Sequence, residues 1–282
     1  MDPVDSADAA WDFAGPVGLA GLGGALIGYR DVGGAGLDLR AAGASSITIV
    51  IGFGEQPVRV DDALGHRALD GFVVGLPAAA MRIRSDRAEC VELRLSPIRA
   101  YSLLGIAPTE LGRGVVALED VWGARARRLR ERLAEAGSWD ERFGLTKAFL
   151  SQCDRDTRTP DPEVLAGWHR ILASHGRVRI GSIAESVGWS HKRLLTRFEA
   201  QIGLTPKRTA MLVRFRHAVD GLLAGRSAAA VAADGGYTDQ AHLARDVALF
   251  AARTPGLLAA HYQPDIARYR YRAWGNFFQD RW

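Results

Sequence analysis

Side chains that can donate hydrogen bonds gather in two short stretches of the C-terminal half, one after Ser190 and one after Thr238. Arg, Lys, Gln and Thr in such stretches are suited to contacting phosphates and base edges. The chemistry available here is therefore recognition of a polyanion rather than bond making. The first stretch contains His191, Lys192, Arg193, Leu195, Thr196 and Arg197, and the second contains Asp239, Gln240, Ala241, His242 and Arg245.

The first stretch follows a pattern that predicts a helix, a turn and a second helix. Apolar residues in 180–187 mark one face of a short helix, and Gly188 begins a tight turn. Ser190 is a good N-cap for a helix over 191–201. The apolar residues of this second helix recur at i, i+4 and i+8 and should point inward, leaving the donors outside: Leu194, Phe198 and Ile202.

The same pattern returns 48 residues later. Residues 228–233 predict a short helix, Gly235-Gly236-Tyr237 a turn, and Thr238 a second N-cap. Leu243 and Val247 should point inward. A long helix from Pro206 to Gly225 joins the two units, and its basic residues Lys207 and Arg208 could lie near phosphates. Two such units held about one turn of duplex apart, roughly 34 Å, would face the same side of DNA.

Residues 177–262 resemble the DNA-binding domain of the AraC/XylS family of bacterial transcription regulators. The stretches that carry the resemblance are IAESVGWSHKRLLTRFEAQIGLTPK, RFRHAVDGLLAG and GGYTDQAHLARDVALFAARTP. The second unit departs from the family at Val247 and Ala252, where an aromatic residue and a glycine are usual, so we expect a second unit that either is looser or contacts mainly phosphate. The resemblance implies that bases are faced by Lys192, Leu195 and Thr196 in the first unit and by Gln240, Ala241 and Arg245 in the second.

Structural roles compete with DNA contact for individual residues of these units. Arg245 could pair with Asp246 or Asp239, and Arg197 with Glu199, as solvated helix pairs. His242 could be a buried, hydrogen-bonded spacer. The aromatic residues at the two turns, Trp189 and Tyr237, are expected to anchor the core.

The first hundred residues read as β-structure and make the chain α+β. Residues 46–52 form a β-branched run, 90–95 alternate in polarity, and Gly and Pro separate such segments. We expect a β-rich barrel or sandwich over 1–118. This half faintly resembles the β-rich, sometimes cupin-like sensor domains that precede such DNA-binding domains, which implies a small-molecule effector or a dimerisation role.

The remaining segments complete the expected organisation. Residues 119–153 should form two helices, 120–136 and 139–152, which either connect the domains, line a dimer seam or cap the barrel. A proline-rich linker over 154–162 leads into the double helix-turn-helix domain, 163–262. Residues 263–282 form an aromatic tail that should pack on the body.

Charge is distributed unevenly between the two halves. Residues 1–162 hold 19 Lys and Arg against 23 Asp and Glu, whereas residues 163–262 hold 13 against 7. A mildly acidic front half and a basic back half are expected when only the back half meets a polyanion, although a solvated basic face would give the same count.

Other functions have weaker support. A metal-dependent β-barrel needs converging ligands, and His66 is the only histidine before residue 162. The sequence has no phosphate-binding Gly-rich loop with Lys, no His-Glu-x-x-His and no Gly-x-Ser-x-Gly, so we expect no catalytic residues, metal or cofactor. Two alternatives stay open, namely a cupin-like enzyme with a vestigial helical domain and a protein-interaction module.

Composition and length agree with a globular protein. The chain has 282 residues, of which 48% are apolar and 24% charged. It lacks a long apolar run and a signal-like start, and Cys90 and Cys153 have no ligand spacing, so we expect a cytoplasmic protein without membrane contact. The expected partner is double-stranded DNA, with an effector bound in 1–118, a homodimer and RNA polymerase as further candidates.

Overall fold

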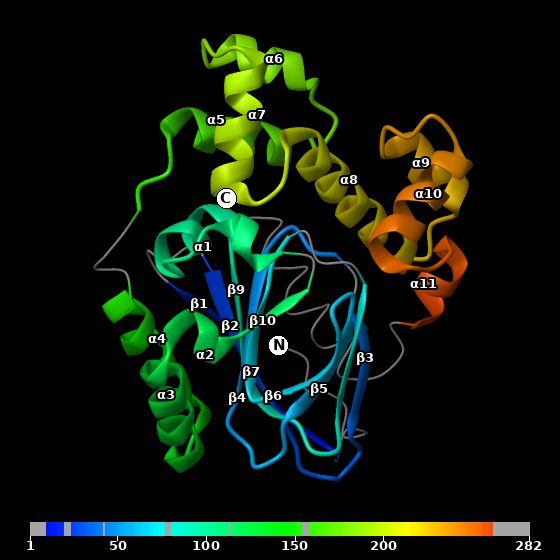
Figure 1. The fold of residues 1–282 in the computed structure, drawn as a ribbon. Helices are drawn as coiled ribbons and strands as arrows, with labels where there is room; N and C mark the ends of the chain where they lie inside the picture. The colour runs from blue at the N-terminus through cyan, green and yellow to red at the C-terminus, as the bar shows by residue number, and fades with distance from the viewer. Residues whose placement is uncertain are drawn as a thin grey trace.

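The computed structural model describes residues 10–19, 24–41, 43–76, 80–112, 114–153 and 158–261, so the expected tail over 263–282 lies outside the described residues. The described chain is α+β, as predicted, with strands in the N-terminal part and helices after them (Figure 1). No described helix has the length and apolar character needed to cross a bilayer.

Two antiparallel sheets form the β-domain. The larger sheet has the order β1-β2-β9-β4-β7-β10 and the smaller has the order β3-β8-β5-β6. This confirms the expected β-rich domain. The strands are β1 (Trp11–Leu19), β2 (Gly24–Asp31), β3 (Leu37–Ala41), β4 (Ile47–Gly52), β5 (Val58–Asp62), β6 (Gly65–Leu69), β7 (Gly71–Val74), β8 (Met81–Ser85), β9 (Glu89–Leu95) and β10 (Val115–Ala117).

Alternation along the strands explains the two-layer arrangement. In β9, Val91, Leu93 and Leu95 belong to the core that the sheet shares with the helices, whereas Cys90 belongs to the core between the two sheets. Both faces of the strand are buried. Glu92, two residues after Cys90, is fully buried and accepts a hydrogen bond from Arg94 at 3.1 Å, which meets the need of a buried carboxylate for a partner.

Short helices follow the β-domain: α1 (Pro97–Leu103), η1 (Pro108–Leu111), α2 (Leu118–Trp122), α3 (Ala124–Glu135) and α4 (Trp139–Cys153). The prediction of a single helix over 120–136 is therefore wrong, because the structure has two helices, α2 and α3, in its place. Gly123 takes a φ of 57° between α2 and α3, a conformation that glycine adopts without steric cost. The next helix, α4, is capped by Ser138, whose hydroxyl accepts a hydrogen bond from the Glu141 N–H at 3.2 Å.

The C-terminal half is entirely helical within the described residues. Its helices are α5 (Pro162–Ala173), α6 (Ile180–Ser186), α7 (His191–Ile202), α8 (Pro206–Leu223), α9 (Ala228–Asp234), α10 (Gln240–Ala251) and α11 (Pro255–His261). The two short-helix pairs and the long helix between them appear as predicted. The long helix α8 begins behind its N-cap Thr205, whose hydroxyl accepts from the Arg208 N–H at 3.3 Å.

The β-domain with α1 and η1 touches the helical part at several places, and two of them involve the outer helices. The C-terminal end of α7 packs on α1 and η1, where Gly203 lies so close to Pro108 that an added Cβ would sit 3.0 Å from the Pro108 carbonyl oxygen. The second contact is a hydrogen bond of 2.9 Å from the Gly43 N–H to the Phe250 carbonyl at the end of α10. In Figure 1 the helical part accordingly stands over one end of the sheets, with α7 running down towards α1.

Candidate nucleic-acid interface

The first helix-turn-helix unit consists of α6 and α7. Ser190 caps α7, because its hydroxyl accepts a hydrogen bond from the Arg193 N–H at 3.2 Å. The inward stripe is confirmed, since Leu194, Phe198 and Ile202 are all fully buried. Gly203 ends the helix in the left-handed conformation with a φ of 89°.

The outer face of α7 presents most of the residues expected there. His191, Lys192 and Thr196 are exposed, and Leu195 is half-buried. The exposed Arg193 lies over the ring of Trp189, with 4.5 Å between its guanidinium carbon and the ring centroid. Trp189 itself is only half-buried, so this turn residue packs against the core and also supports an outward-facing arginine.

Arg197 has a specific partner that the sequence did not reveal. Its guanidinium makes two hydrogen bonds to the Asp161 carboxylate, at 2.7 and 2.8 Å, rather than pairing with Glu199. These bonds hold the pKa of Asp161 below its ordinary value. The Gln201 side chain also accepts a hydrogen bond from the Asp161 N–H at 2.8 Å. Arg197 thus ties α7 to the start of α5.

The second unit, α9 and α10, begins its outer helix one residue later than predicted. Thr238 is not the N-cap. Asp239 has extended backbone (φ −161°, ψ 176°), and its carboxylate accepts a hydrogen bond from the His242 N–H at 2.7 Å. Asp is as good a cap as Thr, and its negative charge also suits the positive end of the helix dipole. Asp239 is therefore engaged in its own helix.

The outer face of α10 is sparser than that of α7. Gln240, Ala241 and Arg245 are exposed. The Arg245 Nε donates to the Ala241 carbonyl at 3.3 Å, and no ion pair to Asp246 or Asp239 is present. His242 is half-buried, with its ring edge-on to Tyr237 and its Nδ1 3.4 Å from the Thr238 backbone nitrogen.

A buried charged pair, missed from the sequence, attaches α10 to the long helix α8. Arg214 lies 3.1 Å from Asp246, with side-chain exposures of 15% and 4%. The Arg214 guanidinium also lies 4.7 Å from the centre of the Tyr237 ring. Tyr237 is buried as expected, and burial, with Asp246 nearby, raises its pKa to about 12.

The two departures from the family pattern have different consequences. Val247 is fully buried. Ala252 ends α10 with a φ of 50°, the left-handed conformation that Gly203 adopts at the end of α7. This conformation costs an alanine roughly 1–2 kcal/mol.

Both outer helices contact the β-domain through their C-terminal ends. The end of α7 lies against Pro108 and the end of α10 is bonded to Gly43, whereas the exposed donors lie nearer the N-terminal end of each helix. Figure 1 shows α7 with its lower end near α1. Lys207 and Arg208 are exposed in the first turn of α8, directly after α7 ends. The Arg208 guanidinium lies 5.7 Å from the ring of Phe250, so it sits near the domain contact rather than near those N-terminal ends.

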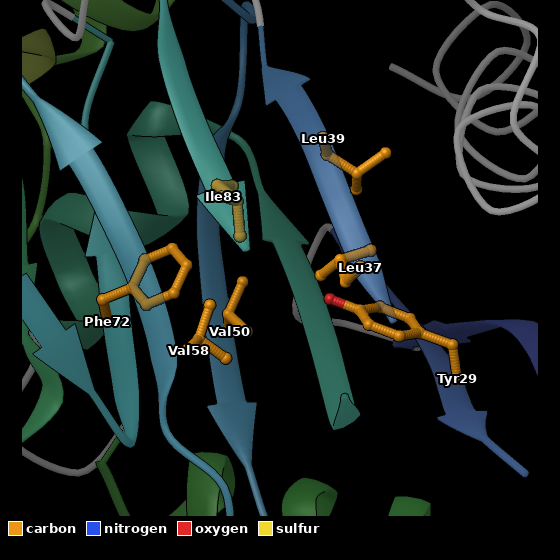
Figure 2. Close-up of a pocket in the computed structure, with 7 residues that line it drawn as sticks. All are labelled: Tyr29, Leu37, Leu39, Val50, Val58, Phe72 and Ile83. Atoms are coloured by element: carbon orange, nitrogen blue, oxygen red, sulfur yellow. The ribbon is translucent and has the colours of Figure 1, made fainter. Parts of the chain in front are cut away.

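Between the two sheets lies a small apolar cavity (Figure 2). It measures about 10 Å³, which is room for one water molecule. A larger molecule in this cavity would therefore require the lining side chains to move. The lining side chains are Tyr29, Leu37, Leu39, Val50, Val58, Phe72 and Ile83.

Within the part of the chain that the structure describes, no three His, Cys, Asp or Glu side chains come together to hold a metal ion. His66 projects into solvent and lies 2.7 Å from Asp61. Cys90 is buried, and the Cys153 Sγ accepts a hydrogen bond from the Arg125 guanidinium at 3.3 Å.

Comparison with known proteins gives one sequence match and several structural ones. Residues 183–260 match the family described as "Helix-turn-helix domain". No curated protein matches the chain.

The structure is similar to ToxT from Vibrio cholerae O395, with a TM-score of 0.49, 9% identity, and coverage of 90% of this chain and 98% of ToxT. It is also similar to unsaturated fatty acid bound ToxT from strain SCE256 (TM-score 0.48, 10% identity, 80% and 94% covered). Similarity to the AraC-like transcriptional activator CuxR is lower in TM-score, at 0.25, with 15% identity and 77% and 89% covered.

The sequence match covers both units and the helix that joins them. It agrees with the caps, the turns and the buried apolar stripes that the structure shows in both units. The C-terminal part of this chain is therefore a helix-turn-helix domain of the AraC type, as the resemblance predicted.

Proposed function

We propose that this protein is a sequence-specific DNA-binding transcription regulator whose two units enter neighbouring major grooves of one duplex. The observation that carries the proposal is that α7 and α10 are held at the β-domain in the same manner. Both helices have their C-terminal ends at the β-domain and their exposed polar residues near the other end. A helix held in this way, with donors on its first turns, suits the major groove.

The two units should contribute differently to recognition. Arg193, held over Trp189, and Lys192 supply donors to bases or phosphates from the first unit. Gln240 and Arg245 do so from the second. Leu195 and Ala241 have no polar side-chain atoms, so they can only pack against a base, for example a thymine methyl. Arg197 and Asp239 have structural roles instead, since Arg197 bonds to Asp161 and Asp239 caps α10.

The β-domain is suited to modulate DNA binding because it touches both units. An effector that moves α1 and η1 would move the end of α7, and one that moves Gly43 would move the end of α10. An effector larger than a water molecule would enlarge the cavity between the sheets by moving the side chains that line it. Such coupling would let ligand binding select one arrangement of the units. Dimerisation and contact with RNA polymerase are further proposals.

Selection of bound duplexes from a random pool, followed by salt titration of the winners, tests the proposal. We expect a defined sequence to be enriched, with an affinity that falls linearly in log Kd against log salt. Addition of small-molecule extracts should shift that affinity if the β-domain is a sensor. Failure to enrich any sequence at any salt concentration would contradict the proposal.

A further inference from the structure

Three basic side chains that the proposed base contacts do not use come together between the two units. His175 and Arg177 lie in the turn after α5, and His217 lies in the middle of α8. The two imidazole rings are stacked, with centroids 4.4 Å apart and planes inclined by 20°. All three side chains are exposed. We call this set the central basic cluster.

The turn that carries the cluster is held closely against its neighbours. Gly176, with a φ of 74°, sits so close to α8 that an added Cβ would lie 2.1 Å from the Ala210 carbonyl oxygen. The aliphatic part of Arg177 packs on Gly236, in the turn of the second unit. The Arg177 Nε donates to the Ser174 carbonyl at 3.2 Å, while its two terminal nitrogens have no hydrogen-bond partner in the described part of the chain.

The central basic cluster faces away from the β-domain. Ala210, Arg214 and His217 share one face of α8 at i, i+4 and i+7. Leu212 packs near Gly43 of the β-domain, and it projects about 200° from Arg214 in a helix of 3.6 residues per turn. The cluster therefore lies on the side of α8 away from this contact, and Arg177 places it beside the turn that precedes α10, whose first residues are proposed to face DNA.

The charges around His217 favour an anion in this position. His217 is exposed overall, but partial desolvation of its ring is the first cause that lowers its pKa, and His175 is the second. Arg177 and Arg226 act in the same direction. Asp220 opposes them, but it lies 3.3 Å from Arg216. Arg226 is itself paired with Asp234. A proton added to His217 would be repelled by the positive charge of Arg177. A phosphate bound at the cluster would offset that repulsion with its negative charge.

We propose that the central basic cluster binds one backbone phosphate of the DNA segment between the two recognised grooves, and that this binding takes up a proton on His217. The proposal rests on the proposed function. It adds a third contact, one that reads no base but fixes the register of both units on the duplex.

Binding measurements at different pH and salt test the cluster directly. The probe is a duplex selected by the wild-type protein, and the variants are His217→Ala and Arg177→Ala. Because phosphate should raise the pKa of His217 in the complex, wild-type affinity should fall from pH 6 to pH 8, by up to about tenfold for each pKa unit gained. His217→Ala should lose part of this fall, and Arg177→Ala should reduce the salt slope by about 1.

Matched controls separate the cluster from general charge effects. His66→Ala and Arg127→Ala remove an exposed histidine and an exposed arginine from the β-domain and from α3, and both should leave the pH and salt profiles unchanged. Arg177→Lys keeps the charge and should retain most of the salt slope. Urea unfolding curves show whether each variant is folded.

A duplex with uncharged methylphosphonates at its central positions locates the contact. These substitutions should weaken the wild-type protein but not Arg177→Ala, which has already lost the contact. Equal weakening of both proteins, together with wild-type pH and salt profiles in His217→Ala and Arg177→Ala, would overturn the cluster and leave the proposed function standing. Failure of the wild-type protein to select any duplex would instead overturn the proposed function, and the cluster with it.

Discussion

The two helix-turn-helix units have the same geometry but are stabilised by different chemistry. Both outer helices have 12 residues, and both short helices have 7. The first unit has an apolar inner stripe, a serine cap and a glycine end. The second has an acidic cap, an alanine end and a buried Asp246 that pairs with Arg214 of α8. The second unit also has a buried apolar stripe, Leu243 and Val247, and the first unit has the more exposed Arg197–Asp161 pair. What sets the second unit apart is therefore one buried polar contact.

The largest difference between the units should follow from breaking that contact. Asp246→Ala leaves Arg214 buried without its partner and should lower the free energy of unfolding by about 3–5 kcal/mol. Urea denaturation measures the loss. The control Asp234→Ala breaks the exposed pair with Arg226 and should have little effect. Similar losses in both variants would show that the buried pair has no special role.

Arginine replacement on the outer faces should separate DNA contact from structural pairing. Arg245→Ala should weaken binding to a selected duplex by about 1–3 kcal/mol. Arg197→Ala should weaken it less, because Asp161 already occupies its guanidinium. Kd values for both variants on one duplex measure the difference. A larger loss for Arg197→Ala would reverse the assigned roles.

Alkaline pH should act on the second unit through Tyr237. The pKa of Tyr237 is raised from 10.0 to about 12 in the folded chain. Its contribution to stability is therefore complete below pH 10 and is lost as the pH rises towards 12. At pH 11 the loss should be about 1.4 kcal/mol.

Tyr237→Phe provides the control for this pH effect. The variant has no phenol to ionise, so its free energy of unfolding should fall less than that of the wild-type protein between pH 9 and pH 11. Urea denaturation at both pH values measures the two slopes. Parallel slopes would show that Tyr237 is not the group responsible.

The smallest expected effects concern the ends of the two outer helices. Ala252→Gly should stabilise the protein by about 0.5–1 kcal/mol, because glycine relieves the left-handed backbone but loses more entropy on folding. Gly203→Ala should destabilise it by more than about 1 kcal/mol, since its Cβ would also press on Pro108. Thermal unfolding of the two variants should therefore shift in opposite directions, and a shift in the same direction would contradict this comparison.

Local signals predicted most of the helical domain. The stripe of Leu194, Phe198 and Ile202 and the cap Ser190 depend on residues within one or two turns, so spacing alone reveals them. The prediction of Thr238 as the second N-cap is wrong, because Thr238 and Asp239 are adjacent and both are good capping residues. The prediction of one helix over 120–136 did not include the break between α2 and α3, because Gly123 lies among residues that otherwise favour a helix.

Contacts between distant residues could not be predicted in this way. Arg214 and Asp246 are 32 residues apart, and Arg197 and Asp161 are 36 apart. Nothing in the local pattern marks these residues as partners, because each also fits an exposed helix face. The stacking of His175 on His217 depends in the same way on how the turn after α5 meets α8.

Hydroxyl-radical footprinting on a selected duplex tests most directly the central claim that both units bind one face of DNA together. The account predicts two protected segments about 10 base pairs apart on the same face of the helix. Asp246→Ala should weaken protection of one segment more than that of the other. A single protected segment in the wild-type protein, or two segments on opposite faces, would contradict the account.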